Sequence, residues 1–545
     1  MARQSSSLSL EHVVKEYEQA WSRLRMLEYP RVEALLGLLH SFELMIKAAE
    51  QSPQILDVPK FVFGLKGLNL LVPHVVSRCH DQIIARNELK KLGFRKAGSL
   101  SGCQAAAIDA LKFGIMYGFF QDFAKSESVS WRLWDEYSAE ISVTNDLLFK
   151  QETMAVLMWE EIDIRPLPIL EALITSPQDN PVSAAEEILS WQTGSFPLED
   201  RWEVGTYTVG EWKRVLQNLI ARALFVKMKA PRMTLPLMAG DSEKLTLDIA
   251  HKVTLPKKRV RDILHDLSFD AQEEKANLAQ TPFIVVGSFL VGSPSLLLLR
   301  RSDWQLLKQW AKRHLTTFNR SHKLIANRIH EELAKAFRER GCETWSDVGY
   351  TSAVDSKRRD IDVLVRDSAE NWLVLQVKAF LPPSPASESL AARSKECVYG
   401  LDQIADARDT ILKAPERVLA GRVKRTNGKY SVRSCDGLLV TTHTYGIPPD
   451  VEFPSVEYVV LRHALRKLSS SVSIPQLISV AAGVQRPLQD APISWQVFWN
   501  SGFVLSFPYV KQIHPRTVWF DRALRGPLFH AVRIIHLIRR RLIGV

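Results

Sequence analysis

Residues 358–380 read RRDIDVLVRDSAENWLVLQVKAF and contain two apolar runs separated by a short polar segment. The first run opens with Asp360 and Asp362, and the second is interrupted by Gln376 and Lys378. Side chains two positions apart in a β-strand lie on the same side of the sheet. The polar segment is short enough to join the two runs as an antiparallel hairpin. The pattern therefore predicts that two carboxylates, an amide and an ammonium group meet at one end of a sheet.

These side chains are unusual in a strand built for a core, because burying such groups without partners costs several kcal/mol. A metal ion or a substrate is the usual compensation. Hard oxygen ligands that leave positions for water favour Mg²⁺ over zinc. A neighbouring lysine can then hold or deprotonate water beside a phosphate. The cluster thus predicts the chemistry of phosphodiester hydrolysis.

The surrounding sequence predicts an α/β domain with a mixed sheet. Its pattern changes from a helical period to a two-residue period and back. The expected elements are a helix over 302–341, strands at 343–348, 360–365 and 372–380, a loop at 381–389, a helix over 397–412, and strands at 437–444 and 456–465. This order of helix, strands, helix and strands is typical of an α/β domain.

Between its flanking helices, this hairpin resembles the PD-(D/E)XK nuclease superfamily, which has the restriction-endonuclease-like fold, over about residues 319–465. Glutamine in the QxK position is similar to the Mrr-type branch of that superfamily. The resemblance implies Mg²⁺-dependent cleavage of DNA, with Mn²⁺ as a substitute, leaving 5′-phosphate and 3′-hydroxyl ends. RNA stays open as a substrate. A role in restriction or defence against foreign DNA rests on analogy of fold alone.

The resemblance also implies a role for individual residues. The metal and catalytic residues would be Asp362, Gln376, Val377 through its backbone carbonyl, and Lys378 as the group that activates water. Glu331 matches the acid that the family carries on the preceding helix, and Glu332 is the neighbouring candidate. These assignments cover only the C-terminal half of the chain.

The match departs from the family's pattern in three places. Arg359 stands where the motif has proline, Asp360 is an extra carboxylate that either supports the metal or faces solvent, and the neutral Gln376 implies a lower metal affinity. Two other functions stay open. One is a nuclease-like fold that binds nucleic acid or protein without cleavage. The other is a nucleotidyltransferase that binds Mg²⁺ through Asp360 and Asp362, although the Gly-Ser pair of that family is missing upstream.

The rest of the chain is predicted to form three further regions. Residues 1–240 are mostly helical in pattern and carry no cofactor motif, and residues 466–545 form a C-terminal extension that ends in a basic amphipathic helix. Residues 241–318 resemble a winged-helix segment, with two short helices around Pro256. The charge-free stretch between Lys275 and Arg300 is interpreted as a buried hairpin, not a membrane span, with its turn at residues 292–294.

Two basic clusters are candidates for contact with phosphates, although a packed helix pair and a solvated hairpin are the alternatives. They consist of Lys257, Lys258 and Arg259 after Pro256, and of Lys424, Arg425 and Lys429 around an Asn-Gly turn. The chain of 545 residues has a formal net charge of +11, which permits a polyanionic partner without requiring one. A homodimer or protein partners stay open.

The five cysteines are scattered and odd in number, so neither a disulfide framework nor a zinc site is indicated. The N-terminal residues contain no apolar signal core. These two observations predict a cytoplasmic protein without stable membrane insertion.

Overall fold

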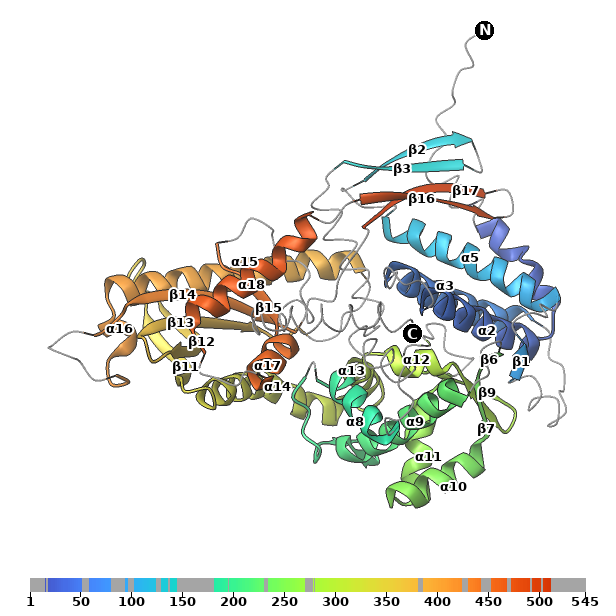
Figure 1. The fold of residues 1–545 in the computed structure, drawn as a ribbon, viewed down its shortest axis with the longest axis horizontal. Coiled ribbons are helices and arrows are strands. Elements are labelled where there is room, and N and C mark those ends of the chain that lie inside the picture. The colour runs from blue at the N-terminus through green and yellow to red at the C-terminus, as the bar shows by residue number, and fades with distance from the viewer. Residues whose placement is uncertain are drawn as a thin grey trace, which may run out of the picture. The chain divides into compact units, whose positions relative to one another are not determined.

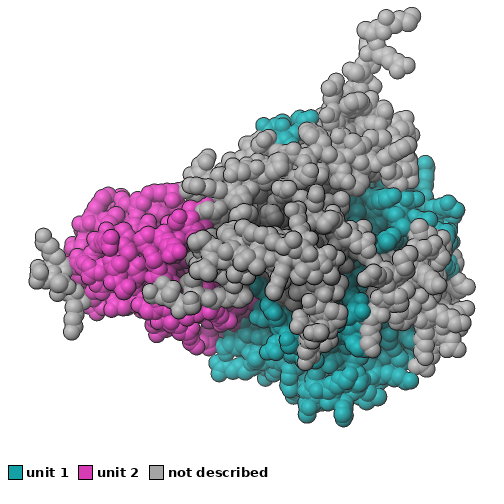
Figure 2. All heavy atoms as spheres, in the orientation of Figure 1, with its two compact units in different colours: residues 1–193, 198–318, 492–512 teal, residues 194–197, 319–491, 513–545 magenta. Residues whose placement is uncertain are grey.

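The computed structural model divides into two compact units, which are drawn in different colours in Figure 2. Unit 1 comprises residues 1–193, 198–318 and 492–512, and unit 2 comprises residues 194–197, 319–491 and 513–545. The residues that the structure describes are 15, 18–50, 58–79, 94–96, 102–123, 129–135, 138–144, 181–194, 196–229, 234–269, 278, 280–380, 386–423, 430–442, 452–467, 472–490, 493–500 and 503–510.

Helices dominate the described N-terminal part of unit 1, as the sequence predicts. They are η1 (Arg25–Glu28), α2 (Arg31–Glu50), α3 (Val58–Arg78) and α5 (Gly102–Phe123). Helices α3 and α5 approach closely where Gly67 meets Gly114. A Cβ atom at Gly67 would lie 2.8 Å from the backbone nitrogen of Ile115, and one at Gly114 would lie 3.0 Å from the carbonyl oxygen of Gly67. Larger residues at either glycine would force the two helices apart.

A four-stranded sheet adds strands to the region that was predicted to be helical. Its order is β16-β17-β3-β2, formed by β2 (Val129–Asp135), β3 (Ser138–Val143), β16 (Ile493–Asn500) and β17 (Phe503–Val510). Residues 493–510, which were assigned to a C-terminal extension, therefore belong to a sheet of unit 1. Local periodicity could not reveal this pairing, because it joins segments from opposite ends of the chain. The predicted basic terminal helix lies outside the described residues.

The middle of the chain contains a second four-stranded sheet with the order β7-β10-β9-β8. The predicted helix pair is present as α10 (Ser242–Val253) and α11 (Lys257–Asp266), and Thr254 takes a left-handed conformation in the turn between them. The remaining elements are α8 (Pro181–Gln192), β4 (Glu203–Val204), β5 (Tyr207–Thr208), α9 (Val209–Lys229), β1 (Phe94–Lys96) with its partner β6 (Thr234–Pro236), β7 (Met238–Asp241), β8 (Ser268–Phe269) and α13 (Ser302–Arg313).

The buried hairpin is present, but its turn is not where the sequence analysis placed it. Strands β9 (Phe283–Val286) and β10 (Phe289–Gly292) are joined at Gly287, which has a φ of 57°. The following Ser-Pro pair starts a helix, α12 (Pro294–Leu299), because the Ser293 hydroxyl accepts a hydrogen bond from the Leu296 N–H at 3.2 Å. Among the described helices, none is long and apolar enough to cross a membrane.

Unit 2 is built on the predicted mixed sheet, with five strands in the order β11-β12-β13-β14-β15 (Figure 1). The first three strands are antiparallel neighbours, and β14 and β15 are added in parallel. The strands are β11 (Glu343–Thr351), β12 (Arg358–Arg366), β13 (Asn371–Lys378), β14 (Ser434–Thr441) and β15 (Ser455–Glu457). The helices are α14 (Leu315–Arg338), α15 (Ala386–Lys413), α16 (Glu416–Leu419), α17 (Tyr458–Lys467) and α18 (Ile474–Asp490).

Two elements of unit 2 differ from the prediction. The run at 456–465 forms only the short strand β15 and then turns into helix α17, because its buried residues Val460, Leu461, Ala464 and Leu465 recur at helical spacing. Helix α15 begins at Ala386, inside the segment that was expected to be a loop. A core of buried side chains from β11–β14 and from α15, including Trp372, Val374, Leu401 and Ile404, holds this helix on the sheet.

The turn between β12 and β13 is fixed by a buried carboxylate, Asp367. Its Oδ1 accepts hydrogen bonds from the N–H groups of Ala369 (2.9 Å) and Asn371 (3.0 Å). Its Oδ2 accepts from the N–H of Ile474 (3.2 Å), the first residue of α18. Burial acts to raise the pKa of Asp367, but the hydrogen bonds from Asn371, Ile474 and Ala369 outweigh it and lower the pKa below its usual range. One side chain thus joins the hairpin to α18.

Asp367→Ala is expected to destabilise the protein by about 3 kcal/mol at neutral pH, because buried N–H groups lose a charged acceptor. The folded pKa is lowered, so this stability is present above the usual aspartate pKa and is lost as the pH falls through the folded value. Urea unfolding of wild type and variant at pH 7 and at acidic pH measures the difference. A difference at pH 7 within the scatter of surface substitutions, about 0.5 kcal/mol, would contradict this role.

Candidate functional site

The hairpin of β12 and β13 brings Asp362 to the backbone of the next strand. The pair of the β12–β13 ladder farthest from the turn is Val363 with Leu375, and Asp362 is the next residue of β12 beyond that pair. The Asp362 side chain is buried, and its Oδ2 accepts a hydrogen bond from the N–H of Val377 at 2.6 Å. The N–H and C=O of a strand residue point to the same side, so the Val377 carbonyl also faces β12. The sequence analysis selected both residues.

Helix α14 contributes a histidine to this place and not the expected glutamate. His330 is buried, and its Nε2 lies 3.9 Å from Asp362 Oδ2. On the other side of the ring, Nδ1 lies 3.0 Å from Oδ1 of Asp347 in β11. His330 therefore lies between two carboxylates from neighbouring strands of the sheet.

The two glutamates that the resemblance selected on α14 have other partners. Glu331 is exposed and accepts a hydrogen bond from Arg328 at 2.6 Å. Glu332 accepts from the hydroxyl of Tyr458 (2.5 Å) and from Arg462 (3.1 Å), and so ties α14 to α17. These hydrogen bonds give each of the two carboxylates a structural role.

Asp347 has a strained backbone at the position opposite Asp362. Its φ is 52°, in the left-handed region that non-glycine residues seldom adopt. The β11–β12 pairing is registered on both sides of this point, from Ser346 with Val363 and from Val348 with Ile361, but not at it. Aspartate tolerates this conformation better than most residues. Such strain clusters at functional sites.

Lys378 is held from the other direction by helix α15. Its Nζ donates to Oε1 of Gln403 at 3.1 Å and lies 5.1 Å from the centre of the Tyr399 ring. A Cβ atom at Gly400 would lie 2.8 Å from Cε of Lys378, so the lysine stem runs closely along this turn of the helix. Gln403 is the polar partner of the ammonium group, and the Tyr399 ring beside it stays largely exposed.

The other two residues of the opening stretch lie in contrasting surroundings. Gln376 is 4% exposed and follows Trp372 and Val374 along β13, on the side of the strand that packs on α15. Asp360 is exposed. The structure thus brings Asp362 to the backbone of Val377 and within electrostatic reach of Lys378, whereas Asp360 is left facing solvent.

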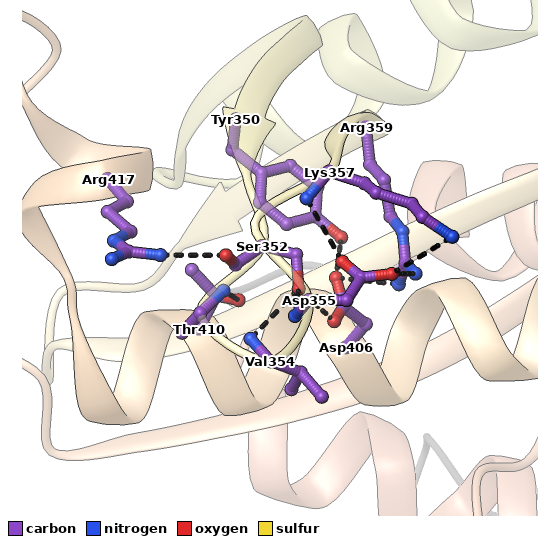
Figure 3. A network of polar contacts seen from close by, with 10 residues as sticks. Tyr350, Ser352, Val354, Asp355, Lys357, Arg359, Asp406, Thr410 and Arg417 are labelled. Atoms are coloured by element: carbon purple, nitrogen blue, oxygen red, sulfur yellow. Dashed lines mark hydrogen bonds and ion pairs between the residues drawn. The ribbon is translucent and has the colours of Figure 1, made fainter.

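A buried network keeps α15 in position against β11 and β12 (Figure 3). Asp406 of α15 accepts hydrogen bonds from the hydroxyls of Tyr350 (2.7 Å) and Ser352 (2.6 Å) and pairs with Arg359 at 2.9 Å. Arg417 donates to the carbonyl of Ser352 at 2.7 Å and holds the same turn from α16. Because Asp406 lies less than one helical turn after Gln403, this network also fixes the partner of Lys378.

The electrostatic state of Asp362 is unusual for an aspartate. Burial raises its pKa, with a further rise from Asp360, and the Val377 N–H, His330 and Lys378 offset this only in part. A carboxylate that costs energy to ionise in the folded protein is a common feature of sites that bind a cation or exchange a proton.

Asp362→Asn is therefore expected to stabilise the metal-free protein by about 1 kcal/mol at neutral pH, because it removes a buried charge and keeps an acceptor for Val377. The folded pKa is raised, so the carboxylate contributes most below its unfolded pKa and loses stability as the pH rises through the folded value. The gain should be present at pH 7.5 and vanish at acidic pH. Thermal unfolding in EDTA measures it, and a variant less stable than wild type at pH 7.5 would contradict it.

Of the three basic residues that were selected on α11 from the sequence, two are paired with acidic side chains. Lys257 pairs with Glu243 at 2.7 Å and Arg259 pairs with Glu211, while Lys258 is exposed. These ion pairs tie α11 to α10 and α9. The second cluster, Lys424, Arg425 and Lys429, lies outside the described residues.

The comparisons with known proteins add no functional assignment to this site. A scan against models of protein families finds no match to this chain, and a search of curated proteins finds none either. Within the described part of the chain, no group of three or more His, Cys, Asp and Glu side chains is arranged to hold a metal ion. The site described above offers two such side chains, Asp362 and His330, with the backbone of Val377 beside Asp362.

Sequence reasoning missed four residues of this site, namely His330, Asp347, Tyr399 and Gln403. Helical spacing contained a signal for one of them, His330. His330 lies three and four positions before Leu333 and Ala334, which are buried, whereas Glu331 lies with Arg328 and Lys335 on the outer side. The positive φ of Asp347 had no signal in the sequence.

Proposed function

We propose that this protein is a divalent-metal-dependent nuclease that hydrolyses phosphodiester bonds, most directly those of DNA. The observation that supports this best is the buried carboxylate of Asp362 against the backbone of Val377, one residue before a lysine whose ammonium is held in place. A buried acid whose pKa is raised gains most from a cation. The net charge of +11 suits a polyanionic substrate.

The donor set fits a small divalent cation. Asp362 would supply a carboxylate and Val377 its backbone carbonyl at the same strand edge, and Gln376, the residue before Val377, would supply an amide oxygen. Oxygen donors with few protein charges match Mg²⁺ or Mn²⁺. The ion, when bound, would polarise the scissile phosphate and increase the acidity of water.

The protein's own groups would then divide the work. Asp362 would fix the position of the cation through its hydrogen bond to Val377, which leaves the carboxylate little rotational freedom. Lys378 would orient the attacking water and place a positive charge near the phosphate, since Gln403 and Tyr399 hold its ammonium group. Asp406 and its partners would keep α15, and so Gln403, in register with the sheet.

A panel of substrates tests this function. Purified protein is incubated with supercoiled plasmid, linear duplex, single-stranded DNA and RNA in Mg²⁺, in Mn²⁺ and in EDTA. We expect cleavage of DNA in either metal and none in EDTA. Cleavage that persists in EDTA would contradict the proposed mechanism, and cleavage of RNA alone would correct the substrate.

A second candidate is a nuclease-like module that binds nucleic acid or protein without cutting. The neutral Gln376 and the outward position of Glu331 favour it, because both remove acidic groups from the metal site. DNA binding in the same panel without cleavage in any metal would select this function. A nucleotidyltransferase is less well supported, since Asp360 is exposed and does not share the buried position of Asp362.

A further inference from the structure

The histidine on α14 brings a nitrogen donor to a site whose other donors are oxygens. His330 lies one residue before the exposed Glu331, with its imidazole between Asp347 and Asp362. Its side chain is only 9% exposed, and its two ring nitrogens face two different carboxylates. The oxygen donors alone do not explain this arrangement.

The hydrogen bond to Asp347 determines what the other nitrogen can do. With Nδ1–H donating to Asp347 at 3.0 Å, the lone pair of Nε2 is available on the side of Asp362. A carboxylate behind a histidine fixes the tautomer and increases the basicity of the free nitrogen, as it does at histidine-ligated metal sites. Asp347 takes its left-handed backbone conformation to reach this position.

The distance between Nε2 and Asp362 Oδ2 is suited to a shared cation. At 3.9 Å the two atoms are too far apart for a hydrogen bond. Two ligand atoms with metal bonds of about 2.1 Å are separated by about 3.0 Å when they are adjacent at a right angle and by about 4.2 Å when they are opposite. The observed distance lies within this interval.

We propose that His330, oriented by Asp347, is a ligand of the metal ion at the Asp362 site and gives this site a preference for a first-row transition ion such as Mn²⁺ over Mg²⁺. The inference rests on the proposed nuclease site and specifies its metal. Mg²⁺ is held in proteins by oxygen donors and keeps much of its water, whereas imidazole is a good ligand for transition ions. The neutral Gln376 has the same consequence, because it leaves fewer charged oxygens to attract Mg²⁺.

Metal binding is measured without any reaction, on the full chain freed of metal. Mn²⁺ is titrated into the protein and its unbound fraction is followed by electron paramagnetic resonance, and Mg²⁺ affinity is obtained by displacement. His330→Ala is expected to weaken Mn²⁺ binding at least about tenfold and to change Mg²⁺ binding little. Asp347→Asn, which suits the positive φ, should weaken Mn²⁺ binding by a smaller factor.

Two further variants, one on α14 and one just after its last residue, make the result specific. Glu331→Gln separates the two assignments for this helix, since it should leave Mn²⁺ affinity unchanged if His330 is the ligand. Glu339→Gln, an exposed residue paired with Lys335, controls for loss of surface charge. Circular dichroism spectra that match wild type are required for every variant.

The outcomes separate this inference from the function on which it rests. Selective loss of Mn²⁺ affinity in His330→Ala supports the inference. Equal Mn²⁺ and Mg²⁺ affinities that His330→Ala leaves unchanged, with binding lost in Asp362→Ala, would overturn the histidine ligand and leave the nuclease site intact. Wild-type protein that binds neither ion would overturn both.

Discussion

Asp362→Ala is expected to reduce metal-dependent DNA cleavage by about 10³-fold or more. This carboxylate is buried at the end of the β12–β13 ladder, where it accepts the Val377 N–H. Its removal takes away the principal anchor for a cation. Cleavage rates of wild type and variant at saturating Mg²⁺ and Mn²⁺ measure the loss.

The control for this variant is another aspartate at the surface of the same unit. Asp409 on α15 forms ion pairs with Arg408 and Lys413 and lies in none of the site's contacts described above. Asp409→Ala should cleave at a rate close to wild type. A rate for Asp362→Ala within about threefold of that for Asp409→Ala would remove Asp362 from the site.

Lys378→Ala is expected to lower cleavage by about 10²-fold or more while the protein still binds metal and DNA. The oxygen ligands remain in this variant, so only the positioned ammonium is lost. Lys378→Arg should not restore the rate, because guanidinium keeps its proton and the space beside Gly400 and Gln403 is shaped for a lysine stem.

Binding and cleavage need to be measured on the same preparation of the lysine variants. Lys413→Ala, on the exposed side of α15, provides the matched change of charge. Fluorescence anisotropy with a labelled duplex in Ca²⁺ gives the affinity, and gel analysis in Mg²⁺ gives the rate. Unimpaired cleavage by Lys378→Ala would exclude the proposed role, and a parallel loss of binding and cleavage would make this lysine a phosphate contact only.

Local pattern was sufficient for the sheet at the centre of unit 2. The alternation in β12 and β13 predicted two adjacent strands, and their short connection predicted that Asp362 would lie at the same end of the sheet as Gln376 and Lys378. The change of period after Gly341 marked the start of the sheet. These features depend on interactions between near neighbours in the chain, which the sequence records directly.

Residues on the covering helices were harder to select. The resemblance drew attention to Glu331, but the outward side of an amphipathic helix is set by its apolar spacing, and that spacing turns His330 inward. Tyr399 and Gln403 lie one helical turn apart, yet their contact with Lys378 depends on how α15 packs on the sheet. Helix packing is a tertiary property that no local pattern contains.

The pairing of strands from opposite ends of the chain was not predicted for the same reason, because it too is a tertiary property. Strand β3 pairs with β17 across most of the length of the chain, and with β2 on its other side, so neither terminal region could be assigned from its own residues. The segment at 456–465 shows a different limit, because a run of Val and Leu fits a strand and a helix about equally well until its neighbours are known.

The most direct test of the central claim is cleavage of an end-labelled DNA duplex by wild type and by Asp362→Asn, side by side in Mn²⁺, in Mg²⁺ and in EDTA. Asp362→Asn is the informative variant because it is expected to be folded and at least as stable as wild type. We expect cleavage by wild type in the presence of metal and none by the variant under any condition. Equal cleavage by the two proteins, or no cleavage by wild type in either metal, would contradict it.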